Sequence, residues 1–146
     1  MKKFAILITA LLVFSAILLS ACGSADTTAK LAGTSWKLVS YGPKDAQIPA
    51  ADGIDTRMDF GTDGNVSGSM GCNRFSGPYS QKGDSITFSA IAATEMACPE
   101  PQMTQESNAF QVLVGSVKIE QSGTSLTIFS ADGTSKLVLA KIEAGL

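Results

Sequence analysis

Histidine is absent from this chain of 146 residues, and charged residues make up only 16% of it. Without histidine a Ser-His-Asp triad cannot form, and a zinc site lacks its usual nitrogen ligand. No Ser-x-x-Lys motif occurs, no phosphate-binding loop ends in Lys-Ser or Lys-Thr, and no dinucleotide fingerprint is present. The sequence therefore predicts a protein that is not an enzyme and that holds no cofactor and no metal ion.

In a chain without histidine, carboxylates are the main candidates for general acids and bases. Asp55 with Asp59, and Glu95 with Glu100, are pairs close in sequence. A glycosidase needs two carboxyl groups about 5 to 9 Å apart across a cleft, which spacing along the chain does not establish. We interpret these residues as surface acids and keep a hydrolase as a minor hypothesis.

The N-terminus has the pattern of a secretory signal. Two lysines precede the apolar run from Phe4 to Leu19, and small residues then lead into Cys22. This junction resembles the lipobox of bacterial lipoproteins. We expect residues 1–21 to be a signal peptide, Cys22 to be lipidated, and residues 22–30 to form a flexible tether. The alternative is an uncleaved membrane anchor, because the apolar run is near the lower length limit of a span.

Removal of the signal leaves 9 basic against 13 acidic side chains and lowers the formal net charge from -2 to -4. An acidic domain argues against nucleic acid as a partner, and it offers no basic patch for anionic lipid. We therefore expect attachment to the membrane through acyl chains on Cys22. The domain is expected to be a monomer whose protein or small-molecule partner is unknown.

Two cysteines are left once Cys22 is assigned to lipid. Cys72 and Cys98 form an even pair, which in an exported protein favours a disulfide worth roughly 3 kcal/mol. Two free thiols, a redox pair and a metal site are the alternatives. The last two are disfavoured because the chain has no Cys-x-x-Cys motif and no histidine.

Alternating apolar residues and Asp-Gly turns predict a mainly β domain with one helix. About eight short antiparallel strands are expected to form a compact barrel or a strongly curved sheet, with one α-helix packed across it. The helix is expected within residues 99–116, with Met103, Phe110, Leu113 and Val114 on its inner face. The strands are expected at 34–41, 55–60, 65–71, 75–80, 85–89, 117–121, 124–129 and 134–142.

Three motifs together resemble one known family. They are Gly71-Cys72-Asn73-Arg74-Phe75 followed by Gly77 and Tyr79, Thr94-Glu95-Met96-Ala97-Cys98, and Gly33-Thr34-Ser35-Trp36. They are similar to motifs of the META-domain family, HslJ-like small lipoproteins of the bacterial envelope. The resemblance covers Leu31 to Ile142, and we place the domain at residues 31–144. Glu95 departs from the pattern, which has a basic residue there.

The resemblance implies a β-barrel with a helix packed across one end. It also implies a role in envelope stress, through heat-shock induction or tolerance of antibiotics. The expected location is the cell envelope, on the outer membrane facing the periplasm in a Gram-negative organism.

Asn73 and Arg74 are the polar residues most conspicuous in the glycine-rich stretch from Gly68 to Tyr79. As possible surface contacts, they would bind a partner or a ligand carboxylate through the planar donors of Arg74. The favoured interpretation is structural: Asn73 adopts a left-handed turn or bonds nearby backbone, and Arg74 pairs with a local acid.

The leading functional hypothesis is a non-enzymatic, lipid-anchored interaction or stress-protection module. One alternative is a lipocalin-like carrier of a small apolar ligand, with a cavity lined by Trp36, Phe60, Phe75, Tyr79 and Phe88. Another alternative is a protease inhibitor that presents a rigid loop.

Overall fold

The computed structural model describes residues 30–143. Cys22, the expected signal peptide and residues 22–29 of the expected tether lie outside the described residues. No helix in residues 30–143 has the length and apolar character needed to cross a membrane.

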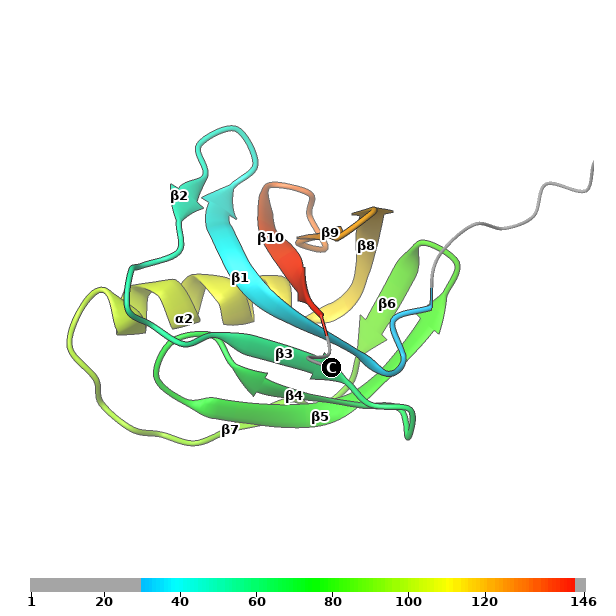
Figure 1. Ribbon diagram of the computed structural model, residues 1–146, viewed down its shortest axis with the longest axis horizontal. Coiled ribbons are helices and arrows are strands. Elements are labelled where there is room, and N and C mark those ends of the chain that lie inside the picture. Colours follow the sequence, from blue (N-terminus) through cyan, green and yellow to red (C-terminus); the bar gives the residue numbers. More distant parts are fainter. Residues whose placement is uncertain (1–29, 144–146) are drawn as a thin grey trace, which may run out of the picture.

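Eight antiparallel strands form a closed barrel (Figure 1). Around the ring the order is β1, β3, β4, β5, β6, β8, β9 and β10, and β10 returns to pair with β1. The expected barrel is therefore confirmed. The ring strands are β1 (Thr34–Pro43), β3 (Arg57–Phe60), β4 (Asn65–Ser69), β5 (Arg74–Lys82), β6 (Ser85–Phe88), β8 (Gly115–Ser122), β9 (Ser125–Phe129) and β10 (Ser135–Ile142).

Two further short strands lie outside the ring. β2 (Ile48–Pro49) pairs with β1 inside the segment that was expected to be a loop. β7 (Ala92–Ala93) pairs with β5 inside the segment expected to be extended. Neither strand was predicted, because two residues are too few to show an alternating pattern.

Asp-Gly turns connect neighbouring strands where they were predicted. Gly64, between β3 and β4, and Gly133, between β9 and β10, have φ angles of 80° and 70°, which favour glycine. The Asp63 carboxylate accepts a hydrogen bond of 3.0 Å from the Asn65 amide and so stabilises the first of these turns.

The barrel interior is filled by side chains. Trp36, expected in the core, is fully buried, and its indole Nε1 donates a hydrogen bond of 2.7 Å to Thr34 Oγ1. Where β1 pairs with β10, Leu38 lies directly opposite Leu139. Trp36, Leu38 and Leu139 belong to one cluster of buried apolar residues. This hydrophobic cluster also includes Met58, Phe60, Val66, Met70, Phe75, Ile86, Phe88, Val117, Ile119, Leu126, Ile128 and Leu137. One contiguous core therefore joins all eight strands.

The two ends of the barrel differ. α2 (Gln102–Val112) lies across the end at which β1, β4, β6 and β9 finish, and we call this the helix end (Figure 1). The opposite end is closed by Leu31, which is fully buried and whose amide donates to Gln81 Oε1 at 3.0 Å. The described chain begins there, at Lys30, so we call it the tether end.

The helix is shorter than the sequence predicted. It was expected within residues 99–116, but it begins at Gln102 and ends at Val112. Gly115 has a φ of 69° and starts β8, two residues before the strand was expected. The helix is capped by Leu113, so Val114 belongs to the connection between helix and strand.

Candidate functional site

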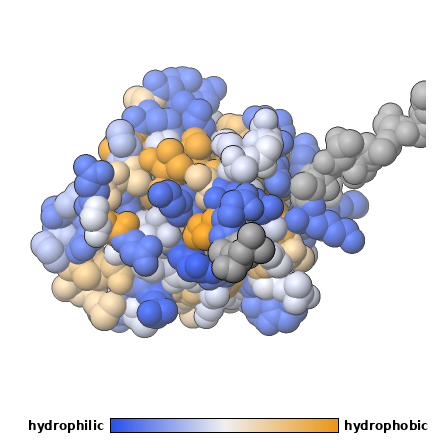
Figure 2. Space-filling model, viewed as in Figure 1, coloured by the Kyte–Doolittle hydropathy of each residue, from blue (hydrophilic) through white to orange (hydrophobic). Residues whose placement is uncertain are grey.

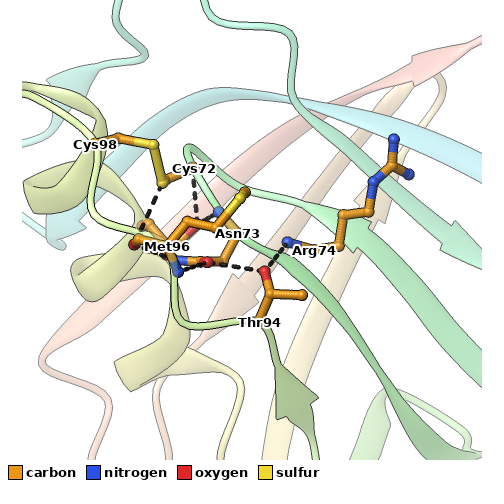
Figure 3. The surroundings of a disulfide bond; sticks show 7 residues. Cys72, Asn73, Arg74, Thr94, Met96 and Cys98 are labelled. Atoms are coloured by element: carbon orange, nitrogen blue, oxygen red, sulfur yellow. Dashed lines mark hydrogen bonds between the residues drawn. A yellow bond between two sulfur atoms is a disulfide. The ribbon is translucent and has the colours of Figure 1, made fainter.

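The two cysteines expected to pair lie together at the helix end (Figure 3). Cys72 is in the connection between β4 and β5, and Cys98 is in the segment that leads from β7 to α2. Their sulfur atoms are 2.02 Å apart and their Cα atoms 6.0 Å apart. The fold thus brings both thiols to the positions that the predicted disulfide requires.

Asn73 connects the same two segments through its side chain. Its Oδ1 accepts hydrogen bonds of 2.8 Å from Thr94 Oγ1 and 2.7 Å from the Met96 amide. Its Nδ2 donates to the Met96 carbonyl at 3.3 Å and to Glu106 Oε1 at 2.6 Å. Figure 3 shows the side chain directed between the disulfide and the β7–α2 segment. Every polar atom of the Asn73 amide is therefore used to hold the two connections to each other and to the helix.

Asn73 had been proposed as a possible surface contact, and burial contradicts that prediction. The residue is only 4% exposed. The left-handed turn expected in the structural interpretation is also wrong, because no non-glycine residue among those described has a positive φ. Hydrogen bonding to nearby backbone, the other half of that interpretation, is confirmed through the Met96 contacts.

Glu106 is the residue on α2 that receives this network. Its Oε2 accepts a hydrogen bond of 2.8 Å from the Cys72 amide and another from the Asn73 amide. The side chain is 4% exposed, and no cation within residues 30–143 forms an ion pair with it. Three N–H donors therefore solvate a buried carboxyl group in place of water.

Gln105 joins the helix to two further connections. Its Oε1 accepts from the Ala51 amide at 2.8 Å, and its Nε2 donates to the Met70 carbonyl at 2.7 Å. Gly71, between Met70 and Cys72, lies so near the helix that an added Cβ would be 2.5 Å from the Gln102 carbonyl oxygen. Only glycine allows this approach, which explains part of the glycine content of the stretch.

The inner face of α2 differs from the predicted one. Gln105, Glu106, Ala109 and Val112 are its buried residues, whereas Met103 and Phe110 are half-buried and Val114 is exposed. Of the predicted face only Leu113 is buried. The prediction assumed an apolar inner face, but two polar side chains occupy it because they satisfy backbone groups of the facing connections. The helical spacing of Gln105 and Glu106 relative to Ala109 and Val112 could have indicated this inner face from the sequence.

Arg74, the second possible surface contact, is exposed. Its amide donates to Thr94 Oγ1 at 3.2 Å, and its side chain points away from Met96 in Figure 3. The expected pairing with a local acid is not found: the ion pairs in the described part of the chain are Arg57–Asp59 and Lys118–Glu120. A role for the guanidinium in contacting a partner stays a prediction.

Two of the four carboxylates weighed for acid–base chemistry, Asp59 and Glu100, accept hydrogen bonds within the fold. Burial tends to raise the pKa of Asp59, but hydrogen bonds from Arg57 and Ser35 outweigh it, so the pKa is lowered. A carboxyl with a lowered pKa is a poor proton donor at neutral pH. Glu95 is exposed, and Glu100 accepts a hydrogen bond of 3.0 Å from the Thr104 amide at the start of α2.

Surface hollows lie at both ends of the barrel. At the tether end, a pocket of about 440 Å³ is lined by Lys30, Gly61, Thr62, Tyr79, Gln81 and neighbouring residues. At the helix end, a shallow groove of about 470 Å³ follows the outer side of α2. Its lining residues are Met103, Glu106, Ser107, Phe110, Gln111 and Val114, and we call it the α2 groove.

Of the aromatic residues expected to line a ligand cavity, four belong to the packed core. Trp36, Phe60, Phe75 and Phe88 are buried in the hydrophobic cluster. Tyr79 alone reaches the pocket at the tether end, where its hydroxyl donates to the Gly61 carbonyl at 3.0 Å. Burial raises the pKa of Tyr79, and the nearby Asp63 adds to the effect.

Comparison with known proteins agrees with this architecture. The META domain family matches residues 29–142. Heat shock protein HslJ of Escherichia coli (strain K12) is 31% identical over 86 residues, which are 58% of this chain and 61% of that protein. The chain thus spans about three fifths of the length of that curated relative.

Two solved structures show the same fold. One is the NMR structure of a protein from Burkholderia xenovorans, with a TM-score of 0.66 and 22% identity over 78% of this chain and 85% of that chain. The other is the crystal structure of a DUF4847 family protein from Bacteroides vulgatus ATCC 8482, with a TM-score of 0.56 and 12% identity over 79% and 96%. Because the family match extends over nearly all of the described barrel and its helix, this chain belongs to the META domain family.

Proposed function

We propose that this protein is a lipid-anchored interaction module of the bacterial cell envelope, without catalytic activity, that protects the envelope under stress. Membership of the META family and similarity to a protein named heat shock protein HslJ support the stress assignment. The lipobox-like junction at Cys22 supports the anchor.

The observation that carries the module assignment is the way the β7–α2 segment is displayed. Thr94 to Ala97 are all exposed, yet this stretch is held on both sides by the Asn73 amide and by Cys98. A segment that is fixed before it meets a partner loses little conformational entropy on binding. A filled barrel that presents a rigid surface is suited to binding through that surface.

Replacement of Cys22 tests the anchor. In the native host, Cys22→Ala should abolish incorporation of labelled palmitate, because the thioether forms on that sulfur. Ser24→Ala, two residues away, should incorporate the label normally. A wild-type chain that takes up no label, or a Cys22→Ala chain that still does, would contradict the proposal.

A carrier function is the second candidate, and the 440 Å³ pocket at the tether end is the feature that favours it. Its volume is within the range of small-molecule sites. However, its lining is rich in glycine and polar side chains, and the expected apolar residues lie in the core instead. Native mass spectrometry of the Ser24–Leu146 domain from a periplasmic extract tests this candidate. A small molecule released on denaturation would favour the carrier over the module.

A further inference from the structure

The α2 groove is an apolar surface that no other part of residues 30–143 covers. Val114 is 62% exposed, and Met103 and Phe110 are half-buried along the same side of the helix. Exposed apolar side chains grouped in one hollow mark interaction sites more often than single exposed ones do.

Met96 extends this surface beyond the helix. Met96 is 52% exposed. Its carbonyl oxygen and Glu106 Oε1 both accept from Asn73 Nδ2, at 3.3 and 2.6 Å, so the Met96 backbone lies near Glu106, one of the groove residues. Figure 2 shows the corner of the molecule formed by the β7–α2 segment, at the lower left, as moderately hydrophobic.

The floor of the groove is rigid, whereas its apolar side chains are adaptable. The Phe110 ring packs edge-on against Phe75, with ring centres 5.7 Å apart. Met96 and Met103 are unbranched thioethers, which adjust to partners of different shape. This combination suits a site that accepts a class of apolar sequences.

Carboxylates outnumber cationic side chains at the helix end. Its connections carry Lys44, and Arg57, Arg74 and Lys136 stand within the first two residues of strands that begin there. The same connections carry six carboxylates, those of Asp45, Asp52, Asp55, Glu95, Glu100 and Asp132. Two of these, Glu95 and Glu100, flank Met96 in the segment that borders the groove. A partner with basic side chains beside its apolar ones would be attracted to this end.

The position of the groove relative to the tether also matters. The described chain begins at the tether end, opposite α2 (Figure 1). Residues 22–29 span at most about 28 Å when fully extended. A chain anchored through Cys22 therefore keeps its tether end within about 28 Å of the membrane, whereas the groove, at the opposite end, can lie farther out on the aqueous side.

We propose that the α2 groove binds cationic amphipathic polypeptide segments. The apolar side of such a segment contacts Met96, Phe110 and Val114, and its lysines or arginines lie beside Glu95 and Glu100. This inference rests on the proposed function as an interaction module and names the chemical class of its partner.

The direct test is binding of a designed peptide. The probe is a fluorescent 18-residue peptide of leucine and lysine in which the leucines form one helical face. Anisotropy is measured with the Ser24–Leu146 domain, which contains every strand of the ring and the helix. Two control peptides are used, one of the same composition with the pattern scrambled and one with glutamate in place of lysine. Binding should require both the pattern and the positive charge, and it should weaken between about 50 and 500 mM salt.

A pair of matched variants locates the site. Met96→Lys with Val114→Lys adds two positive charges to the groove and should weaken peptide binding at least tenfold, roughly 1.4 kcal/mol or more. Val39→Lys with Ile48→Lys adds the same charges at two other exposed apolar residues, each 44% exposed, and should leave the affinity within about twofold. All four positions are exposed, so both variants should keep the wild-type melting temperature.

Three results would overturn the inference. The first is equal affinity of the groove variant and wild type, and the second is equal binding of the scrambled or glutamate peptide. The third is a dimer in sedimentation that only the groove variant loses, because the occupant would then be a second copy of the chain. Failure of these tests leaves the Cys22 result untouched, so the partner class and the anchored location are judged separately.

Discussion

At the scale of single residues, the helix end depends on one buried carboxylate. Glu106 accepts hydrogen bonds from the Cys72 amide, the Asn73 amide and the Asn73 side chain. Asn73 Nδ2 also reaches the Met96 carbonyl at 3.3 Å, but the Cys72 and Asn73 amides bond only to the Glu106 carboxylate. Loss of the acceptor therefore costs more than the hydrogen bonds themselves, because buried N–H groups are left unpaired.

Glu106→Ala should lower the free energy of unfolding by about 2 kcal/mol or more, and the melting temperature by roughly 8 °C. Thermal unfolding followed by circular dichroism gives both values. Ser107→Ala, at the exposed neighbouring position, is the control and should change the melting temperature by no more than about 2 °C. A Glu106→Ala chain as stable as this control would show that the network contributes nothing to stability.

Exposed aspartates in the turns contribute to the stability of the fold in a way that depends on pH. Hydrogen bonds from Ser130 and from Thr134 lower the pKa of Asp132 below 3.8. Hydrogen bonds from the Asn65 side chain and amide lower that of Asp63 in the same way. Since the unfolded chain then binds protons more readily than the folded one, acid favours unfolding.

The stability from these aspartates should be present in full above about pH 5 and lost as the pH falls through 3.8 and below. Melting temperatures measured from pH 7 to pH 2.5 should show this decline. Asp132→Asn should show a smaller decline than wild type, because it removes one of the two carboxyl groups with a lowered pKa. Identical curves for Asp132→Asn and wild type would contradict the assignment.

At the scale of elements, α2 and three connections form one unit. The disulfide positions link the β4–β5 connection to the β7–α2 segment, and Gln105 links the β2–β3 and β4–β5 connections to the helix. Gly71 permits the close approach between them. The rigidity of the exposed segment from Thr94 to Ala97 is a property of this unit, because the segment itself has no regular secondary structure.

The Cys72–Cys98 bond should account for about 3 kcal/mol of stability in the exported protein, on the chain-entropy account of a loop with 26 residues of separation. Dithiothreitol should therefore lower the melting temperature of wild type by on the order of 10 °C. It should have no effect on Cys72→Ser with Cys98→Ser, whose melting temperature should match that of reduced wild type. Two titratable thiols in unreduced protein from the periplasm would mean that the bond does not form.

At the scale of the whole molecule, the two ends of the barrel carry different features. The tether end receives the chain from the proposed anchor and is closed by Leu31. The helix end carries the excess of carboxylates and the α2 groove. A core that joins all eight strands keeps the two ends at a fixed distance and orientation.

Much of the fold could be predicted because its signals are local. Alternation around Trp36 and Leu38 and the Asp63-Gly64 turn depend on neighbours in sequence, and the structure confirms them. Residues that act across long sequence separations could not be predicted. Asn73 and Glu106 are 33 residues apart, and neither position indicates by itself that the other will satisfy it. Burial of Leu31 at the barrel end was missed for the same reason.

By itself the sequence determined the β class, the positions of the turns, a helix within residues 99–116 and the pairing partners open to two cysteines. Hydrophobic alternation and the backbone preferences of glycine act within a few residues, so they can be recognised from the sequence without a structure. Only the tertiary structure decided that the barrel closes, that α2 turns Gln105 and Glu106 inward, and that Met103, Phe110 and Val114 line one groove. Those outcomes depend on which connections meet at one end of the barrel, and such contacts form only when all eight strands are in register.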